Sequence, residues 1–257
     1  MPNSTDLNST ERFSNRVEDY KKHRPNYPRE LIRILTDHGA LTENAVVADI
    51  GSGTGHLTKI LLPHSQTVYG VEPNDEMRLE AEKYFYGLTN HISINGSAEL
   101  TGLPDQSVDL LTAAQAFHWF DAEKTRREFK RILKPEGYVA LIWNVRDTEA
   151  DDFQRKYEQM LRTHIINYKQ TFARTASNEH IHQFFAPNEV KIVQLANEQT
   201  FDLQALKGRL MSSSYAPKPP DPVFDILMRE LEKLFIKFHR NDRVKFIYKT
   251  KIYLSQL

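Results

Sequence analysis

Hydrophobic and polar positions form alternating blocks along the first 150 residues, and each block is either short and apolar or longer and amphipathic. Short apolar runs rich in β-branched residues are typical of buried strands, whereas apolar residues three and four positions apart are typical of helices. The pattern predicts strands at 45–50, 67–72, 91–95, 107–113 and 138–143, and helices at 55–62, 75–86 and 121–134. Such alternation predicts a parallel sheet with helices on both faces.

The two ends of the chain have a different pattern. Residues 11–38 predict two helices with a break at Arg24-Pro25-Asn26-Tyr27-Pro28 between them. After residue 150 the pattern predicts helices at 151–172, 178–185, 203–212 and 222–239, and β-rich stretches at 189–201 and 243–254. We therefore divide the chain into N-terminal helices at 1–40, an α/β core at 41–149, and a helical region with closing strands at 150–257, all packed into one domain.

The most informative stretch is the turn Gly51-Ser52-Gly53-Thr54-Gly55, which follows an apolar strand and the acid Asp49. Glycines let a ligand lie against bare backbone and permit the positive φ of a sharp turn. The predicted helix after the turn points N–H groups at the same place. The second apolar strand ends in Glu72, and an acid at that position of a βαβ unit is where the diol of a ribose is bound. The pattern predicts a nucleotide site at this edge of the sheet.

Composition narrows the classes of function. The chain has 34 basic and 34 acidic residues, and a formal charge of zero argues against a protein whose main task is to bind a nucleic-acid backbone. It has no cysteine, so disulfides, thiolate metal sites and thiol nucleophiles are excluded. His180 and His182 are two histidines without a third ligand in the pattern, and no metal site is expected. No apolar run approaches the ~18 residues of a membrane span, so a cytoplasmic protein without membrane contact is expected.

Several motifs together resemble the class I S-adenosylmethionine-dependent methyltransferases with a type 11 methyltransferase domain, and specifically the small-molecule branch that includes trans-aconitate methyltransferases. They are the turn Asp49 to Gly55, the strand end Gly70 to Met77, the loop Asn95 to Pro104, the segment Ser107 to Phe120 and the turn Leu133 to Tyr138. The resemblance implies a Rossmann-like, seven-stranded, mostly parallel sheet with an antiparallel terminal strand. It also implies an N-terminal helical lid, helical insertions after strands five and six, a cofactor-binding core and a substrate side at 150–257.

The resemblance implies S-adenosyl-L-methionine as the cofactor. Its site would comprise Asp49, Gly51, Ser52, Gly53, Gly55, Glu72, Pro73, Ser97, Ala98, Gln115 and Arg24. In this reading the glycine turn carries the methionine end, Glu72 holds the ribose hydroxyls, and Ser97 with Ala98 contacts the adenine edge. Tyr20 would close over the methionine end, with Arg24 near its carboxylate or near the acceptor.

Methyl transfer from a sulfonium needs a nucleophile placed in line about 3 Å from the methyl carbon, exclusion of water and sometimes a base. His118, after the fourth strand, is a candidate general base, although a lone histidine equally serves as a structural hydrogen bonder. Arg146, after the fifth strand, suits a carboxylate on the acceptor, unless Asp147 or Asp151 pairs with it. Tyr20 completes the candidate catalytic set.

The function predicted on these grounds is metal-free methyl transfer to an oxygen, with nitrogen as second choice, of a small and anionic metabolite. A monomer or weak homodimer that binds neither nucleic acid nor membrane is expected. Two alternatives stay open at this point: a methyltransferase acting on RNA or protein, and a nonenzymatic nucleotide-binding protein on a similar sheet. A nicotinamide oxidoreductase is disfavoured because the turn is G-x-G-x-G and not G-x-G-x-x-G.

Overall fold

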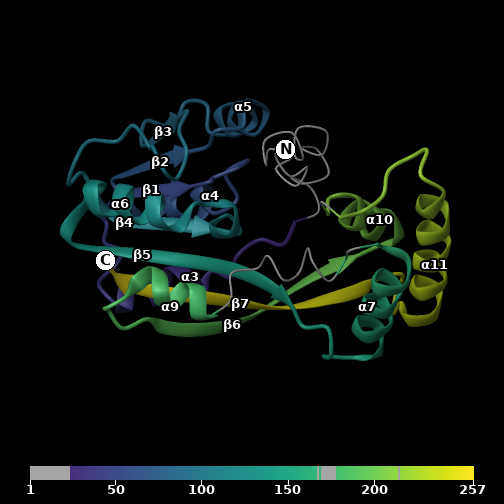
Figure 1. Cartoon of the computed structure of the whole chain (residues 1–257). Coiled ribbons are helices and arrows are strands. Elements are labelled where there is room, and N and C mark those ends of the chain that lie inside the picture. The colour runs from purple at the N-terminus through teal and green to yellow at the C-terminus, as the bar shows by residue number, and fades with distance from the viewer. Residues whose placement is uncertain (1–23, 167, 169–177, 214) are drawn as a thin grey trace, which may run out of the picture.

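The computed structural model describes residues 24–166, 168, 178–213 and 215–257. A seven-stranded sheet with the order β3-β2-β1-β4-β5-β7-β6 runs through the whole molecule (Figure 1). Strands β1 to β5 pair in parallel, and β7 is antiparallel to both of its neighbours, β5 and β6. The mostly parallel sheet with an antiparallel last strand is thus confirmed. The strands are β1 (Val46–Ile50), β2 (Thr67–Val71), β3 (His91–Ile94), β4 (Val108–Ala114), β5 (Leu133–Arg146), β6 (Lys191–Phe201) and β7 (Val244–Gln256).

Helices cover both faces of the parallel half of the sheet, as the alternating pattern predicts. One face packs on α3, α4 and α5, through buried residues such as Leu35, Leu61 and Ala81. The other face packs on α6 and α9, through Phe129 and Phe184. These helices are α3 (Glu30–Asp37), α4 (Thr58–Leu61), α5 (Asp75–Tyr84), α6 (Ala122–Ile132) and α9 (Asn178–Phe185), with short 3₁₀ turns η1 (Leu62–His64) and η2 (Phe117–Trp119).

A third hydrophobic cluster lies at the other end of the molecule, where β5, β6 and β7 extend beyond the shorter strands (Figure 1). It is formed by α7 (Asp152–His164), α10 (Leu203–Met211) and α11 (Pro222–Phe238), which pack on the ends of β6 and β7. We call this part the helical lobe. The predicted helical insertions after the fifth and sixth strands are confirmed, because α7 follows β5, and α10 and α11 follow β6.

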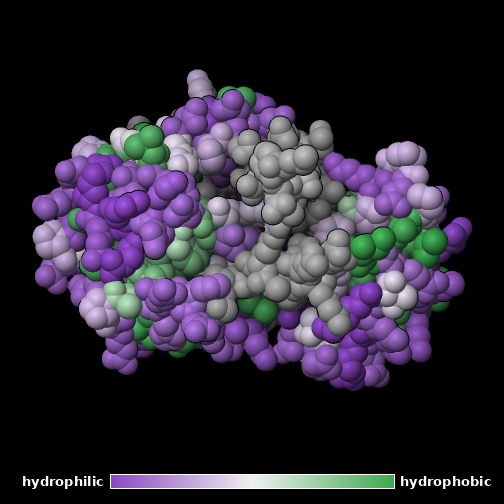
Figure 2. Space-filling model, viewed as in Figure 1, coloured by the Kyte–Doolittle hydropathy of each residue, from purple (hydrophilic) through white to green (hydrophobic). Residues whose placement is uncertain are grey.

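The apolar side chains that the three clusters bury leave a predominantly hydrophilic outer surface on the face seen in Figure 2. Hydrophobic residues are gathered there in small patches. Within the described residues, no helix has the length and the apolar composition needed to cross a bilayer.

Several element boundaries differ from the prediction: the helix predicted at 151–172 ends at His164, and two other differences have a clear physical reason. The predicted helix at 55–62 begins only at Thr58, because the glycine turn continues through Gly55 at φ +85°. The strand predicted at 138–143 is the much longer β5, which pairs with nine residues of β7 from Tyr138 to Arg146. Of the predicted N-terminal lid, α3 packs against the sheet, and residues 1–23, including Tyr20, lie outside the described residues.

Candidate cofactor-binding site

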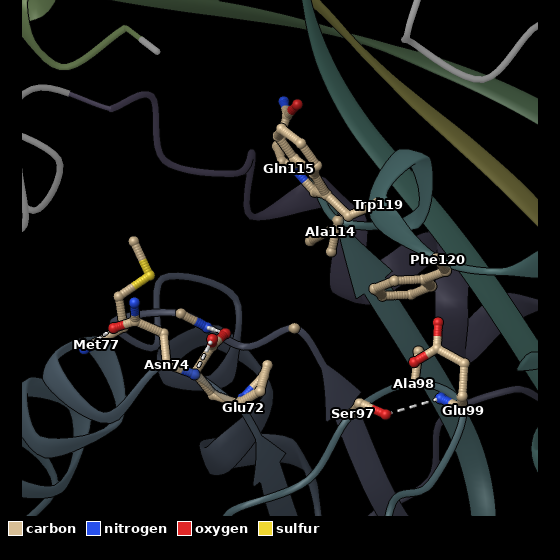
Figure 3. A pocket seen from close by; sticks show the side chains of 14 residues that line it. Glu72, Asn74, Met77, Ser97, Ala98, Glu99, Ala114, Gln115, Trp119 and Phe120 are labelled. Carbon is tan, nitrogen blue, oxygen red and sulfur yellow. Dashed lines mark hydrogen bonds between the residues drawn. The ribbon is translucent and has the colours of Figure 1, made fainter. Parts of the chain in front are cut away.

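An open pocket with a cavity volume of about 150 Å³ lies at the carboxyl ends of β1, β2 and β4 (Figure 3). Ligands of open parallel sheets bind at this edge, because the strand ends and the following loops meet there. The pocket is lined by Gly51, Gly53, Glu72, Pro73, Asn74, Met77, Ser97, Ala98, Glu99, Ala114, Gln115, Ala116, Trp119 and Phe120. Seven of the residues predicted for the cofactor therefore line one pocket: Gly51, Gly53, Glu72, Pro73, Ser97, Ala98 and Gln115.

The glycine turn approaches the pocket with bare backbone at Gly51 and Gly53, whose φ values are +69° and +56°. A Cβ on Gly53 would meet only Met77 Sδ at 3.7 Å, so the turn itself has room that a ligand can occupy. Gly55 does not line the pocket. A Cβ there would lie 2.4 Å from a ring carbon of Phe85, so this glycine serves packing against the end of α5.

Four of the five amide hydrogens of the turn are used inside the protein. The N–H groups of Gly51 and Ser52 both donate to the carbonyl of Val71, at 2.8 and 3.2 Å, and that of Gly55 donates to the carbonyl of Ser52 at 3.0 Å. The N–H of Gly53 donates to Glu72 Oε2 at 2.9 Å. A cradle for a phosphate needs amides that point at the anion. These four amides do not, so the turn offers close approach without an anion site.

Glu72 joins the turn to the start of α5. Its Oε1 accepts from the N–H of Asn74 at 2.9 Å, while Oε2 accepts from Gly53. The side chain is 7% exposed and lines the pocket. Burial raises the pKa of this carboxyl, and the two backbone donors oppose the rise. Each carboxylate oxygen retains a further lone pair, so Glu72 can accept from ligand hydroxyls while it holds the turn.

Asp49 lies beneath the turn and does not line the pocket, which corrects its predicted place in the cofactor site. Its Oδ2 accepts from Thr58 Oγ1 at 2.7 Å, and its Oδ1 accepts from Thr112 Oγ1 at 2.9 Å. Burial raises the pKa of Asp49 to about 6, against the effect of both hydroxyls. The carboxylate thus fixes β1, β4 and α4 relative to one another, and it supports the pocket from below.

The opposite wall comes from the loop after β3. Ser97 Oγ accepts from the N–H of Glu99 at 3.3 Å, and both side chains line the pocket beside Ala98 (Figure 3). Glu99 Oε1 also accepts from the N–H of Asp121, at the residue that caps α6. This wall therefore presents a hydroxyl and a carboxylate, both able to accept from an exocyclic amine.

The upper wall follows β4. Gln115 has φ +58°, which a non-glycine residue adopts only when its surroundings enforce it, and such strain collects at functional sites. Its N–H donates to the carbonyl of Ile142 at 2.9 Å, and Nε2 donates to that of Asn144 at 3.1 Å. Trp119 and Phe120 add aromatic surface to the same wall (Figure 3). Flat apolar side chains of this kind suit packing against a purine ring.

The two predicted catalytic residues that the structure describes, His118 and Arg146, do not line this pocket. His118 is absent from its lining, and its ring packs beside Trp119 with centroids 5.0 Å apart. Tyr20 lies outside the described residues. Across the described chain, no group of three or more histidine, aspartate and glutamate side chains is placed to hold a metal ion.

Arg146 is buried in the helical lobe, and this corrects the expectation that it faces the crevice freely. Its Nη2 forms an ion pair with Glu158 of α7 and donates to Tyr168 Oη at 3.1 Å. The guanidinium also stacks 4.7 Å from the ring centroid of Tyr157. Neither of the acids considered from sequence is the partner: Asp147 pairs with Lys249 at 2.8 Å, and Asp151 caps α7. The partner is Glu158, twelve positions further along the chain, and no local sequence pattern predicts that pairing.

Two further residues predicted for the cofactor lie elsewhere. Ser52 is in the turn but does not line the pocket. Arg24 donates from Nη2 to the carbonyl of Ser212 at 2.9 Å, which places it against the end of α10. Sequence reasoning missed Asn74, Met77 and Glu99 in the lining. Asn74 could have been found, because it is the N-cap of α5 directly after Glu72, and its side chain accepts from the N–H of Met77.

A strand-end glycine turn, an acid on the second strand and an aromatic wall on one parallel sheet define a Rossmann-like nucleotide-binding fold. Residues 48–141 match the sequence model of a family described as a methyltransferase domain. The chain is 35% identical over 139 residues to an uncharacterised methyltransferase of Schizosaccharomyces pombe, covering 54% of each chain. It is 37% identical over 135 residues to an uncharacterised methyltransferase of Mycobacterium tuberculosis, covering 52% of this chain and 53% of the relative.

Among solved structures, the fold is similar to the YcgJ protein of Bacillus subtilis, with a TM-score of 0.58 at 20% identity over 89% of this chain and 98% of that one. Residues 48–141 therefore resemble a methyltransferase domain, and the chain has the same Rossmann-like fold as this solved structure. The chain spans about half the length of the curated relatives that it matches.

Proposed function

We propose that this chain is an S-adenosylmethionine-dependent methyltransferase that transfers the methyl group to an oxygen, or as second choice a nitrogen, of a small acceptor that bears a carboxylate. The observation that carries the cofactor assignment is the glycine turn. Its amides donate within the protein and to Glu72, so the pocket suits a nucleoside without phosphates. A dinucleotide would need those amides for its pyrophosphate.

The lining residues fit this cofactor. Glu72 can accept from the ribose hydroxyls, and the bare backbone of Gly53 leaves room beside it. Ser97 and Glu99 offer acceptors to the adenine amine, with Trp119 and Phe120 as flat neighbours of the ring. When bound, S-adenosylmethionine supplies a methyl group on a positively charged sulfur.

The protein contributes to the reaction by positioning the acceptor relative to the methyl group. The acceptor oxygen forms its bond to the methyl carbon as the carbon–sulfur bond breaks, and the electron pair of that bond stays on sulfur. An ionised carboxylate oxygen or a deprotonated hydroxyl needs no further base at that moment. Gln115, held at positive φ in the pocket wall, donates to the carbonyl of Asn144 in β5, and β5 continues from there into the helical lobe, so we place the acceptor between the pocket and that lobe. Zero net charge supports a small acceptor over nucleic acid.

The direct test is titration calorimetry with S-adenosylmethionine, S-adenosylhomocysteine and NAD, on the wild type and on Glu72→Gln. The variant is expected to lose about 1.5–3 kcal/mol of cofactor binding, because a charged acceptor is removed from the ribose. Glu82→Gln is the matched control, since Glu82 bonds to Ser93 at 2.7 Å on the surface and does not line the pocket. Tight binding of NAD by the wild type, or equal cofactor affinity in both variants, would contradict the assignment.

A further inference from the structure

A buried group of arginines and tyrosines lies where β5 and β7 enter the helical lobe. Tyr248 of β7 stands opposite Arg146 in the antiparallel register. Arg209 of α10 donates from Nε to Tyr248 Oη at 3.2 Å. Both arginines are 8% exposed. We call this group the arginine cluster, and it consists of Arg146, Arg209, Tyr157, Tyr168, Tyr215 and Tyr248.

Positive charge exceeds negative charge in the arginine cluster. Glu158 pairs with Arg146, but it also accepts from Nε of the surface residue Arg162 at 2.7 Å. Arg209 has no carboxylate partner in the part of the chain that the structure describes, and it is held by hydroxyls, with Nη1 donating to Ser213 Oγ at 2.9 Å. Burying a guanidinium without an anion is costly, and buried charges in proteins are ordinarily paired, so a bound anion would supply the partner that Arg209 lacks.

Both arginines have guanidinium N–H groups that make no hydrogen bond within the described residues. Nη1 of Arg146 is enclosed and has no hydrogen-bond partner within the described ranges of the chain. Nη2 of Arg209 has none among the described residues either, and it is not sealed from solvent. The two guanidiniums act on the same tyrosine: burial raises the pKa of Tyr157, and Arg146 and Arg209 oppose the rise. Both arginines also flank Tyr248, because Arg146 stands opposite it in the strand register and Arg209 donates to its hydroxyl, so the two charges lie on either side of one residue.

The arginine cluster is adjacent to the cofactor pocket along a single strand. Gln115, in the pocket wall, donates from Nε2 to the carbonyl of Asn144. Arg146 follows two residues later in β5, about 7 Å further along an extended strand. Arg24 reaches the same region from the other side, through the carbonyl of Ser212. A small molecule of a few carbons can span that distance.

We propose that the arginine cluster is an oxyanion site that anchors one carboxylate of the methyl acceptor. The proposal rests on the function proposed above, because it places the acceptor between this cluster and the methyl group. Guanidinium donors match the planar, two-oxygen geometry of a carboxylate, and the tyrosine rings accept the hydrocarbon beside it. The acceptor is then an aliphatic acid with a second oxygen some carbons away, such as a dicarboxylate, and that second oxygen receives the methyl.

The test measures anion binding separately from cofactor binding. Succinate, glutarate, adipate and citrate are titrated into the protein with and without S-adenosylhomocysteine, alongside inorganic phosphate and the neutral dimethyl succinate. We expect at least one dicarboxylate to bind, and Arg209→Gln to weaken it about 10- to 100-fold by loss of charge-assisted hydrogen bonds. Arg162→Gln is the matched control, because Arg162 contacts Glu158 from the surface, and it is expected to change affinity less than about threefold.

A stability measurement separates an anion site from a merely structural arginine. Arg209→Met replaces the charge by an apolar side chain of similar length. Without anion it is expected to melt no lower than the wild type, because the uncompensated buried charge is gone, and it should lose the rise in melting temperature that the acid gives the wild type. A melting temperature well below that of the wild type would overturn the proposal.

The remaining outcomes are also decisive. If no carboxylate binds, or if Arg209→Gln binds the carboxylates as tightly as the wild type does, the anion site is wrong. The proposed function still stands in that case, provided that the protein binds S-adenosylhomocysteine. Binding of phosphate alone supports an oxyanion site and overturns the carboxylate. Carboxylate binding without any S-adenosylhomocysteine binding supports the arginine cluster and overturns the proposed function.

Discussion

The cofactor pocket and the arginine cluster stand at the same edge of one sheet and carry opposite charges. Beneath and beside the pocket, Asp49 and Glu72 are buried carboxylates whose pKa values are raised, first of all by burial. In the cluster, Arg146 and Arg209 are buried guanidiniums. The pocket therefore suits hydroxyl donors and a positive sulfonium, whereas the cluster suits an anion. In the function proposed above, this difference in charge would place the cationic methyl donor in the pocket and the anionic acceptor at the arginine cluster.

The two regions also differ in what holds them together. The pocket is built from backbone: strand ends, positive-φ turns and amide bonds to one carboxylate. The cluster is built from long side chains that meet across β5, β7, α7 and α10. Changes in the pocket should therefore affect binding more than stability, and changes in the cluster should do the reverse when they break an ion pair.

Gly53→Val should have the largest effect on ligand binding, and only binding in the cofactor pocket should be lost. The added side chain would occupy the ligand's place and would resist φ +56°. We expect no detectable binding of S-adenosylhomocysteine by calorimetry, with carboxylate binding retained. Gly39→Val is the control, because Gly39 has φ +69° with no atom within 4 Å of an added Cβ. Both variants should lose about 1–3 kcal/mol of stability from backbone strain, and only one should lose the cofactor. Normal affinity in folded Gly53→Val would show that the turn does not touch the ligand.

Arg146→Met should be the most destabilising change in the arginine cluster. It leaves the buried Glu158 with the surface Arg162 and the hydroxyl of Tyr168 as partners, and breaking a buried pair typically costs about 3–5 kcal/mol. Urea denaturation should show that loss, while the double variant Arg146→Met/Glu158→Met recovers a substantial part of it. In buffer without urea, where both variants are folded, their affinity for the cofactor should equal that of the wild type. If the single variant is as stable as the wild type, Glu158 is not the partner that holds this lobe.

The pH dependence of stability should reveal Asp49. Its pKa is raised from 3.8 to about 6, so its protonated form is favoured in the folded state. The stability that this group contributes is then fully present below about pH 3.8 and is lost as the pH rises through about 6. The free energy of unfolding of the wild type, minus that of Asp49→Asn, should fall by about 2–3 kcal/mol between pH 4 and pH 7. Chemical denaturation at four pH values measures this, and a difference that is flat with pH would show that Asp49 is not desolvated.

Sequence alone predicted the parallel half of the sheet and most of the pocket, and the reason is local. Gly51, Gly53 and Glu72 are tied to their roles by the strand–turn–helix order around them, so a short window contains the whole signal. Gly55 lies in the predicted turn but does not line the pocket, and its packing against Phe85, thirty positions further on, could not be predicted from the turn. No spacing rule carries that information.

The helical lobe could be predicted only as helices and strands. Arg146 was singled out by its place after β5, but its partners Glu158 and Tyr168 depend on how α7 folds back onto that strand. Arg209 sits in an amphipathic helix, where an arginine is ordinarily a solvated residue, and its burial follows from the packing of α10 on Tyr248. Charges that meet through tertiary packing leave no periodic signal.

The smallest expected change in affinity concerns Ser97, and it tests whether the pocket recognises the adenine base. Ser97 Oγ is a neutral acceptor in the wall that also carries Glu99. Ser97→Ala should weaken S-adenosylhomocysteine binding by about 0.5–1 kcal/mol, the worth of one neutral hydrogen bond. Ser97→Asp should strengthen it by a similar amount, because a charged acceptor holds the amine more firmly, although repulsion from Glu99 limits the gain.

The inosine analogue of S-adenosylhomocysteine, which has a carbonyl in place of the adenine amine, makes this last prediction specific. It offers no amine donor at that position, so Ser97→Asp should gain nothing with it and should lose affinity, since two acceptors would face each other. Calorimetry of both ligands on the wild type, Ser97→Ala and Ser97→Asp gives the coupling between the side chain and the amine. A coupling near zero would place the adenine edge elsewhere, while leaving Glu72 and the glycine turn as the ribose side of the pocket.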